Sequence, residues 1–268
     1  MSRKNAGGAV TASRENLETL QFPMLSEISH VQHAVFTRNG GFSKAPFDSL
    51  NVGFSVGDRD DVVSKNREAV AEYLRAGRLA FAGQVHGSDI LVIEDVPGHG
   101  VNPPFFHAGT GDAMMTDLPG VYLVIQTADC QAVMLVDPQK NVVANAHVGW
   151  RGNTQNILGR TVGEMQRRFG SDPSDVRAAV GPSLGPCCAE FVNYRTEFPR
   201  EFWRYRDDRD RFDLWAVSFD QLAAAGLPRE NIWLSRVCTK CHDARFFSYR
   251  AHGVTGRFAS AIGLRQDP

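Results

Sequence analysis

The hydrophobic and polar positions along the chain follow two different periods. Short apolar runs, alternating or continuous, predict strands, and apolar residues spaced three or four apart predict helices. We therefore expect helices at 61–76, 154–169 and 214–225. The predicted strands lie at 31–37, 79–85, 90–94, 121–127, 132–136, 141–147, 176–180, 232–234 and 246–249.

The order of these elements favours an α+β fold over a doubly wound parallel sheet. Strands follow one another in the middle of the chain, where the turn residues 137–140 connect two of them as a hairpin. No internal repeat or low-complexity linker divides the sequence. We expect a flexible polar leader over 1–20, a single domain over 21–268, and a long surface loop at the Gly- and Pro-rich stretch 97–111.

Composition and charge exclude several classes of protein. The chain has 268 residues with 29 basic and 30 acidic side chains, a net charge of −1, which argues against nucleic-acid binding. No apolar run approaches the roughly 20 residues that span a bilayer, and the start has no secretory signal, so we expect neither a membrane partner nor export. Five cysteines are too few for a disulfide scaffold and indicate reduced thiols in the cytoplasm.

Three predicted strands end in a metal-capable side chain beside a glycine-containing turn. These side chains are His86, Cys130 and His147, the last two on neighbouring strands. Two histidines and a cysteine suit Zn²⁺ and leave a fourth position for water or substrate. The alternatives are three unconnected strand-end residues, or a Cys130–His147 nucleophile and base pair oriented by Asp129 or Asp112.

Two further motifs have weaker interpretations. Residues 238–242 match the C-x-x-C-H haem-attachment pattern, but without export we interpret the match as coincidence; a second zinc site there would need Cys187 and Cys188. Copper is possible at the His₂Cys set if Met114, Met115 or Met134 is axial. None of the eight histidines forms the His-x-His pair of a multicopper oxidase, which excludes a four-copper laccase.

Short motifs in a fixed order span His33 to Arg257. They are 33–43 (HAVFTRNGGFS), 49–51 (SLN), 66–67 (NR), 84–87 (QVHG), 112–113 (DA), 127–130 (TADC), 147–152 (HVGWRG), 181–185 (GPSLG), 247–250 (FSYR) and 256–257 (GR). Together they resemble the YfiH family, also called the laccase-domain or multicopper polyphenol oxidase family, whose members are described as purine nucleoside phosphorylases. The resemblance implies an α+β domain with a mixed-sheet, sandwich-like core flanked by helices.

The resemblance also implies a function and a set of site residues. It implies that His86, Cys130 and His147 bind Zn²⁺, and that purine nucleosides and phosphate are substrates for phosphorolysis. Adenosine deamination and cleavage of S-methyl-5′-thioadenosine are further implied activities, and amide hydrolysis in peptidoglycan precursors or copper-dependent polyphenol oxidation is the alternative. The candidate catalytic residues are Asp129 and Arg151, and the candidate substrate-binding residues are Ser43, Asn51, Gln84 and Arg250.

Overall fold

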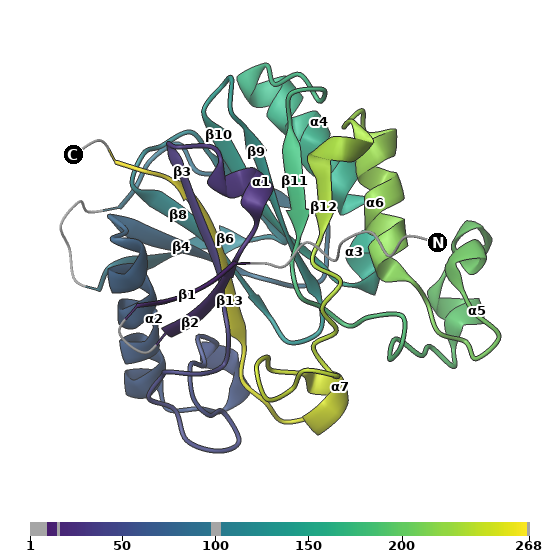
Figure 1. The fold of residues 1–268 in the computed structure, drawn as a ribbon, viewed down its shortest axis with the longest axis horizontal. Coiled ribbons are helices and arrows are strands. Elements are labelled where there is room, and N and C mark those ends of the chain that lie inside the picture. The colour runs from purple at the N-terminus through teal and green to yellow at the C-terminus, as the bar shows by residue number, and fades with distance from the viewer. Residues whose placement is uncertain (1–9, 15–16, 98–102, 267–268) are drawn as a thin grey trace.

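Two β-sheets form the centre of the protein. The computed structural model describes residues 10–14, 17–97 and 103–266, and within these the sheets have seven and six strands (Figure 1). The seven-stranded sheet has the order β1 (Val10–Arg14), β2 (Leu17–Gln21), β3 (Val31–Phe36), β13 (Phe258–Leu264), β8 (Val121–Thr127), β4 (Arg78–Gly83), β6 (Phe105–Thr110). The six-stranded sheet has the order β12 (Ile232–Leu234), β11 (Arg177–Val180), β9 (Gln131–Asp137), β10 (Val142–Val148), β7 (Ala113–Thr116), β5 (Ile90–Val92).

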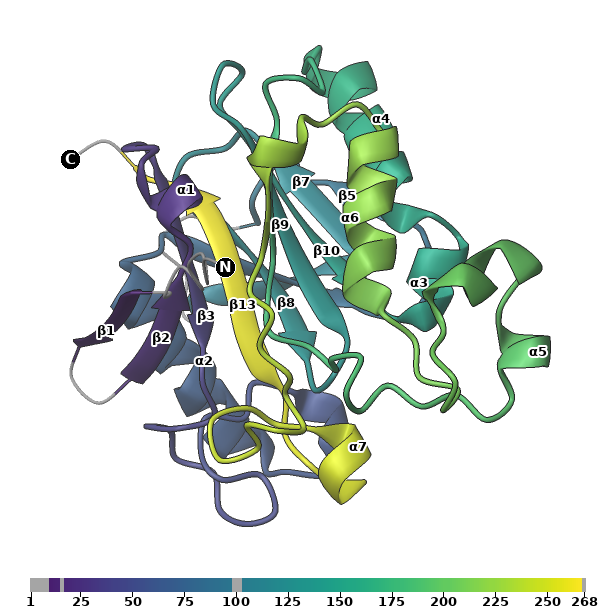
Figure 2. The same ribbon diagram turned by 45° about the vertical axis from the view of Figure 1, so that its right-hand side comes forward.

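Helices cover the outer face of each sheet. Helix α2 (Asp60–Leu74) packs on the seven-stranded sheet, and α4 (Ile157–Phe169) and α6 (Leu214–Ala224) pack on the other, which gives four layers (Figures 1 and 2). The shorter helices are α1 (Pro23–Ser26), α3 (Trp150–Thr154), α5 (Tyr194–Glu197) and α7 (Tyr249–His252), with 3₁₀ turns at Phe54–Val56, Arg200–Tyr205 and Arg229–Asn231. None of the helices described is long and apolar enough to cross a membrane.

Alternating side chains explain why the sheets are sandwiched. In β8, Leu123 and Ile125 point into the core between the sheets, whereas Tyr122 and Val124 pack toward α2. Both faces of these strands are therefore apolar, which accounts for continuous apolar runs rather than clean alternation. The expected α+β domain with a sandwich-like, mixed-sheet core and flanking helices is confirmed.

A buried amide links the two sheets next to the candidate site. Asn145 on β10 donates its Nδ2 hydrogens to the carbonyl oxygens of Leu123 (3.0 Å) and Ser260 (2.8 Å), both in the other sheet. Its side chain is fully buried, so these bonds form away from competing water. They fix the position of β10, two residues before His147.

Most predicted elements are present within a few residues. The helix expected at 154–169 is divided, because Asn156 adopts a left-handed conformation (φ 53°) and its side chain caps α4 by accepting from the Gly159 N–H. The strand expected at 246–249 is wrong: the side chain of Ser248 accepts from the Ala251 N–H and begins helix α7. Local hydrogen bonds of polar side chains decide both differences.

Two expected irregular segments are partly strands. Val10–Arg14 forms β1 and Leu17–Gln21 forms β2, which pair with each other. β2 also pairs with β3 and buries its apolar side chains, so the flexible leader expected over 1–20 is wrong for both strands. Residues 1–9 and 15–16 of that leader lie outside the described residues. The loop expected at 97–111 contains β6, which pairs in parallel with β4; residues 98–102 are outside the description. β6 is an edge strand and β2 lies next to the opposite edge, where polar side chains weaken the apolar signal in the sequence.

Acid should destabilise the protein through His33. This side chain is 2% exposed, its Nε2 accepts the Phe22 N–H (2.7 Å), and burial together with the positive charge of Arg265 lowers its pKa to about 4. The unfolded state binds the proton first as pH falls below about 6.5, so the free energy of unfolding should drop by about 2 kcal/mol between pH 7.5 and pH 5. Denaturant titrations at both pH values measure this loss.

The variant His33→Gln should remove most of that pH dependence, because glutamine can accept the same backbone hydrogen bond without titrating. His107→Gln is the matched control, since His107 is an exposed histidine on β6. An equal pH dependence in His33→Gln and in the unaltered protein would contradict the assignment.

Candidate metal centre and active site

The three predicted ligands meet at one end of the sandwich. His86 follows β4, Cys130 immediately precedes β9, and His147 lies on β10, where its backbone pairs with Ala132 of β9. Their donor atoms lie within 4.8 Å of one another; the Cys130 Sγ is 3.9 Å from the His86 Nε2, and the two imidazole centroids are 4.8 Å apart. His86 is exposed and His147 is 3% exposed, so the set is open on one side only.

The carboxylate of Asp112 positions both histidines. Its Oδ1 is 2.7 Å from the His147 Nδ1 and also accepts the His86 N–H (3.0 Å). Its Oδ2 accepts the N–H groups of Val85 (3.1 Å) and Gly87 (2.7 Å). Asp112 is fully buried, and a buried ionised carboxylate needs such donors. A carboxylate on the far nitrogen of a ligating histidine is the usual outer partner in metal sites.

Backbone geometry at the site is unusual. His86 and Asp129 adopt positive φ angles (61° and 99°), which non-glycine residues avoid. Gly149 has no room for a side chain, since a Cβ there would lie 3.1 Å from the Cys130 Sγ and 3.1 Å from the His86 Cδ2. The chain is therefore arranged so that the three donor groups approach each other closely.

The charges of Cys130 and His147 depend on each other. Although burial opposes ionisation, the positive charge of His147 and hydrogen bonds from His147 and His86 lower the pKa of Cys130 to about 6. Burial also opposes protonation of His147, but the Cys130 thiolate and the Asp112 hydrogen bond raise its pKa to about 9. Burial alone would raise the pKa of Asp112, but hydrogen bonds from His147 and the Gly87 N–H lower it. The thiolate is the form that binds metals.

The donor set fits a single transition-metal ion. Its two imidazoles and one thiolate match three-ligand catalytic zinc sites, which keep a fourth position open. The axial methionine of a blue-copper site is missing: Met114, Met115 and Met134 are fully buried in the core, and no methionine of the described chain lines the adjacent cavity.

A cavity of about 740 Å³ opens over the three donors. This volume is typical of small-molecule sites. The wall contains three arginines, Arg151, Arg250 and Arg257, and the aromatic side chains of Trp150, Phe191 and Tyr249. Arg151 stacks on the Trp150 ring (Cζ to centroid 4.3 Å), and within the described residues no carboxylate forms an ion pair with it.

Asp129 lines the cavity, but its carboxylate is occupied by hydrogen bonds. Its Oδ1 accepts from the hydroxyls of Thr239 and Ser248, both at 2.7 Å, and its Oδ2 accepts the Arg250 N–H at 2.5 Å. Three donors fix the orientation of this carboxylate. The geometry thus supports a positioning role for Asp129, the candidate catalytic carboxylate.

Two of the four candidate substrate-binding residues line the cavity and two do not. Gln84 and Arg250 line the cavity, but both ends of the Gln84 carboxamide bind the backbone of Gln126. Ser43 and Asn51 are buried beneath it and do not line it; both donate to Asp58. Asn51 supports the cavity wall indirectly, because its Oδ1 accepts the N–H of the cavity residue Arg257.

Arg257 also lines the cavity, although no role for it was predicted from the sequence. Its guanidinium donates to the carbonyl oxygens of Thr255 and Gly256, and burial lowers its pKa despite the nearby charges of Cys130 and Asp129. An arginine that follows a glycine in a turn carries no periodic signal. Only its presence in the last shared motif could have indicated a role.

Comparison with known proteins agrees with this geometry. The family described as multi-copper polyphenol oxidoreductase laccase matches residues 32–265. The chain belongs to this family. It is 40% identical over 246 residues to the purine nucleoside phosphorylase YlmD of Geobacillus stearothermophilus (86% of this chain, 89% of that one) and 32% identical over 240 residues to the purine nucleoside phosphorylase YfiH of Escherichia coli (85% and 91%). The crystal structure of the hypothetical protein YfiH of Bacillus licheniformis superposes with a TM-score of 0.84 at 32% identity (94% and 97%).

Replacing Asp112 with asparagine should weaken metal binding. An amide cannot accept from four donors, so His147 and the turn at His86 lose their fixed orientation. We expect the zinc dissociation constant, measured by chelator competition, to rise roughly 10- to 100-fold. Asp137→Asn is the matched control, because Asp137 is an equally buried aspartate that accepts backbone hydrogens in a remote turn. Unchanged zinc affinity in Asp112→Asn would disprove the positioning role.

Proposed function

We propose that this protein is a zinc-dependent purine nucleoside phosphorylase. The observation that carries the proposal is the convergence of His86, Cys130 and His147 on a nucleoside-sized cavity whose wall contains three arginines. The names of its relatives in Geobacillus and Escherichia support the same activity. Small-molecule substrates also agree with a net charge of −1, because they need only a few local cations.

The arginines of the cavity suit phosphate. Guanidinium groups bind phosphate oxygens with two parallel N–H donors. The Arg151 guanidinium stacks on the face of the Trp150 ring. The N–H groups around the edge of the guanidinium therefore stay available for an anion. The Arg250 side chain donates to the Glu190 carbonyl oxygen (2.8 Å) while Asp129 binds its backbone, so this arginine is also held in place. We assign the phosphate to Arg151 and Arg250.

Aromatic side chains suit the purine base. Tyr249 is 59% exposed on the cavity wall, although large aromatic side chains are usually buried. Phe191 faces the same cavity and is fixed edge-on against Phe198 and Phe212. A flat heterocycle stacks on such rings with about 1–3 kcal/mol per base. We propose that the base lies against Tyr249 or Phe191.

The reaction follows from these positions. An oxygen of phosphate attacks the ribose C1′ as the bond to the purine nitrogen breaks, and the ribose passes through an oxocarbenium-like state. Arg151 and Arg250 orient the phosphate, and Asp129 fixes the backbone of Arg250. A bound Zn²⁺ would supply a Lewis acid at the cavity floor. S-Methyl-5′-thioadenosine has the same glycosidic bond, so we propose that it is cleaved in the same way.

Adenosine deamination is a second proposed activity. The observation that favours it is the three-donor set with one open side, since deamination of bases at zinc sites uses histidine and cysteine ligands.

Amide hydrolysis is the alternative function. The Cys130, His147 and Asp112 side chains have the order of a nucleophile, base and orienting acid, which favours it. The two alternatives differ in whether they require metal.

Product analysis tests the proposal. Zinc-loaded protein incubated with adenosine should release adenine and ribose 1-phosphate only when phosphate is present, as measured by liquid chromatography. Inosine formed without phosphate would demonstrate the deaminase activity. The variant His147→Ala should lose the zinc ion held with His86 and Cys130, and both products together with it.

Two results would contradict the proposal. One is full nucleoside turnover in His147→Ala after it has lost the zinc ion held with His86 and Cys130. The other is no product from any purine nucleoside while a muramyl-peptide amide is hydrolysed by the metal-free protein, which would establish the amidase.

The phosphate assignment predicts a selective defect in Arg151→Ala. Loss of a charge-assisted hydrogen-bond donor costs about 1.5–3 kcal/mol, so the KM for phosphate should rise roughly 10- to 100-fold while the KM for the nucleoside changes little. Steady-state kinetics with each substrate varied separately measures both constants. Arg160→Ala, an equivalent change on the solvent side of α4, should leave both unchanged. Equal rises in both constants would show that Arg151 does not bind phosphate.

A further inference from the structure

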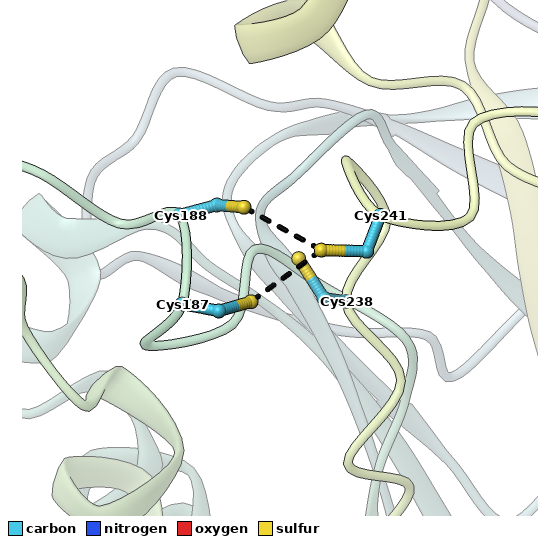
Figure 3. A group of neighbouring side chains, drawn as sticks. All are labelled: Cys187, Cys188, Cys238 and Cys241. Atoms are coloured by element: carbon cyan, nitrogen blue, oxygen red, sulfur yellow. Dashed lines mark hydrogen bonds between the residues drawn. The ribbon is translucent and has the colours of Figure 1, made fainter.

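Four of the five cysteines meet at a single point away from the candidate active site. Cys187 and Cys188 lie on the loop after β11, and Cys238 and Cys241 lie on the loop after β12 (Figure 3). All four Sγ atoms lie within 4.8 Å of one another. The C-x-x-C-H segment therefore has the two further thiols that a second metal site requires.

The sheet explains why these distant segments meet. Strands β11 and β12 are parallel neighbours, so the loops after them leave the same edge of the sheet. Hydrogen bonds continue beyond the strands, from the Ser183 N–H to the Val237 carbonyl (3.1 Å) and from the Thr239 N–H to the Ser183 carbonyl (3.0 Å). The two loops thus approach as an extension of the sheet, with two thiols on each.

The spacing of the sulfur atoms fits one metal ion. Four sulfurs at about 2.3 Å from a tetrahedral zinc ion lie about 3.8 Å apart. The Cys241 Sγ lies 3.6 Å from the sulfurs of both Cys187 and Cys188, which favours neither as a disulfide partner. A group this tight has room for one ion but not for a cluster of several irons with bridging sulfides.

Hydrogen-bond donors lie beside two of the four cysteines. The Gly185 N–H donates to the Cys238 Sγ (3.3 Å), and backbone donors to sulfur stabilise a thiolate. A Cβ at Gly185 would lie 3.1 Å from the Cys238 Cβ and 2.7 Å from the Trp215 ring, so only glycine allows this approach. The Arg211 guanidinium donates to the Cys187 carbonyl (3.3 Å), which places a positive charge beside the four sulfurs.

We propose that Cys187, Cys188, Cys238 and Cys241 together bind a second zinc ion as a closed structural site. Four protein ligands leave no position for substrate, unlike the set at His86. The ion would hold together two loops beside the cavity. In one, Glu190 and Phe191 of the cavity wall follow Cys188. In the other, Thr239 lies between Cys238 and Cys241 and donates to the cavity residue Asp129. The second site thus supports the first without contacting substrate.

Zinc stoichiometry and X-ray absorption test the second site. Purified, zinc-loaded and desalted protein should contain two zinc ions per chain by mass spectrometry of the metal. His147→Ala should keep one, with a zinc K-edge spectrum showing four sulfur neighbours at about 2.3 Å and no nitrogen. This measurement leaves the cysteine loops unaltered, so it does not depend on how a loop variant folds.

The reciprocal variant is Cys238→Ser/Cys241→Ser, which should also keep one zinc, now with mixed nitrogen and sulfur neighbours. Lys240→Ala is the matched control, because Lys240 is an exposed residue between the same two cysteines and should leave two zinc ions. Zinc-free His147→Ala, iron in place of zinc, or a disulfide among the four cysteines in freshly purified protein would each overturn the proposal. Because bound metal is the readout, failure here is distinct from failure of the nucleoside activity.

Discussion

The candidate active site depends on one buried carboxylate. Asp112 accepts the ring N–H of His147 from β10 and three backbone N–H groups from the turn after β4, which belongs to the other sheet. A carboxylate removed from water is stable only with such donors, and the donors are held only if it stays ionised. The Asp112 carboxylate and its donors therefore stabilise one another, and together they hold the two sheets in place where His86, Cys130 and His147 meet.

A second carboxylate connects the active site with the cysteine cluster. Asp129 precedes Cys130 and accepts hydrogen bonds from Thr239, which lies within the cysteine loop, and from Ser248 and the Arg250 backbone. The two candidate metal centres are therefore mechanically linked although they share no ligand. An open three-donor set beside a closed four-thiol set matches the general division between catalytic and structural zinc sites.

The sequence predicted the interior of the fold better than its edges. Central strands such as β8 and β9 are apolar on both faces and give a strong signal, whereas β6 at an edge was expected to be loop and β2 to be part of a flexible leader. The same distinction applies to the site. His86, Cys130 and His147 end predicted strands and were identified, while Ser43 and Asn51 shared the motifs but support the cavity from beneath.

By itself the sequence indicated the α+β class through its local periods, and residue types at strand ends made His86, Cys130 and His147 candidate donors; the sandwich-like core was implied by the family resemblance. Only the tertiary structure decided which donors meet, which carboxylate positions them, and that Cys187 and Cys188 join Cys238 and Cys241. About fifty residues separate the two cysteine pairs, and their contact follows from the parallel pairing of β11 and β12. Pairing between strands distant in sequence depends on the whole packed sheet, so no local pattern encodes it.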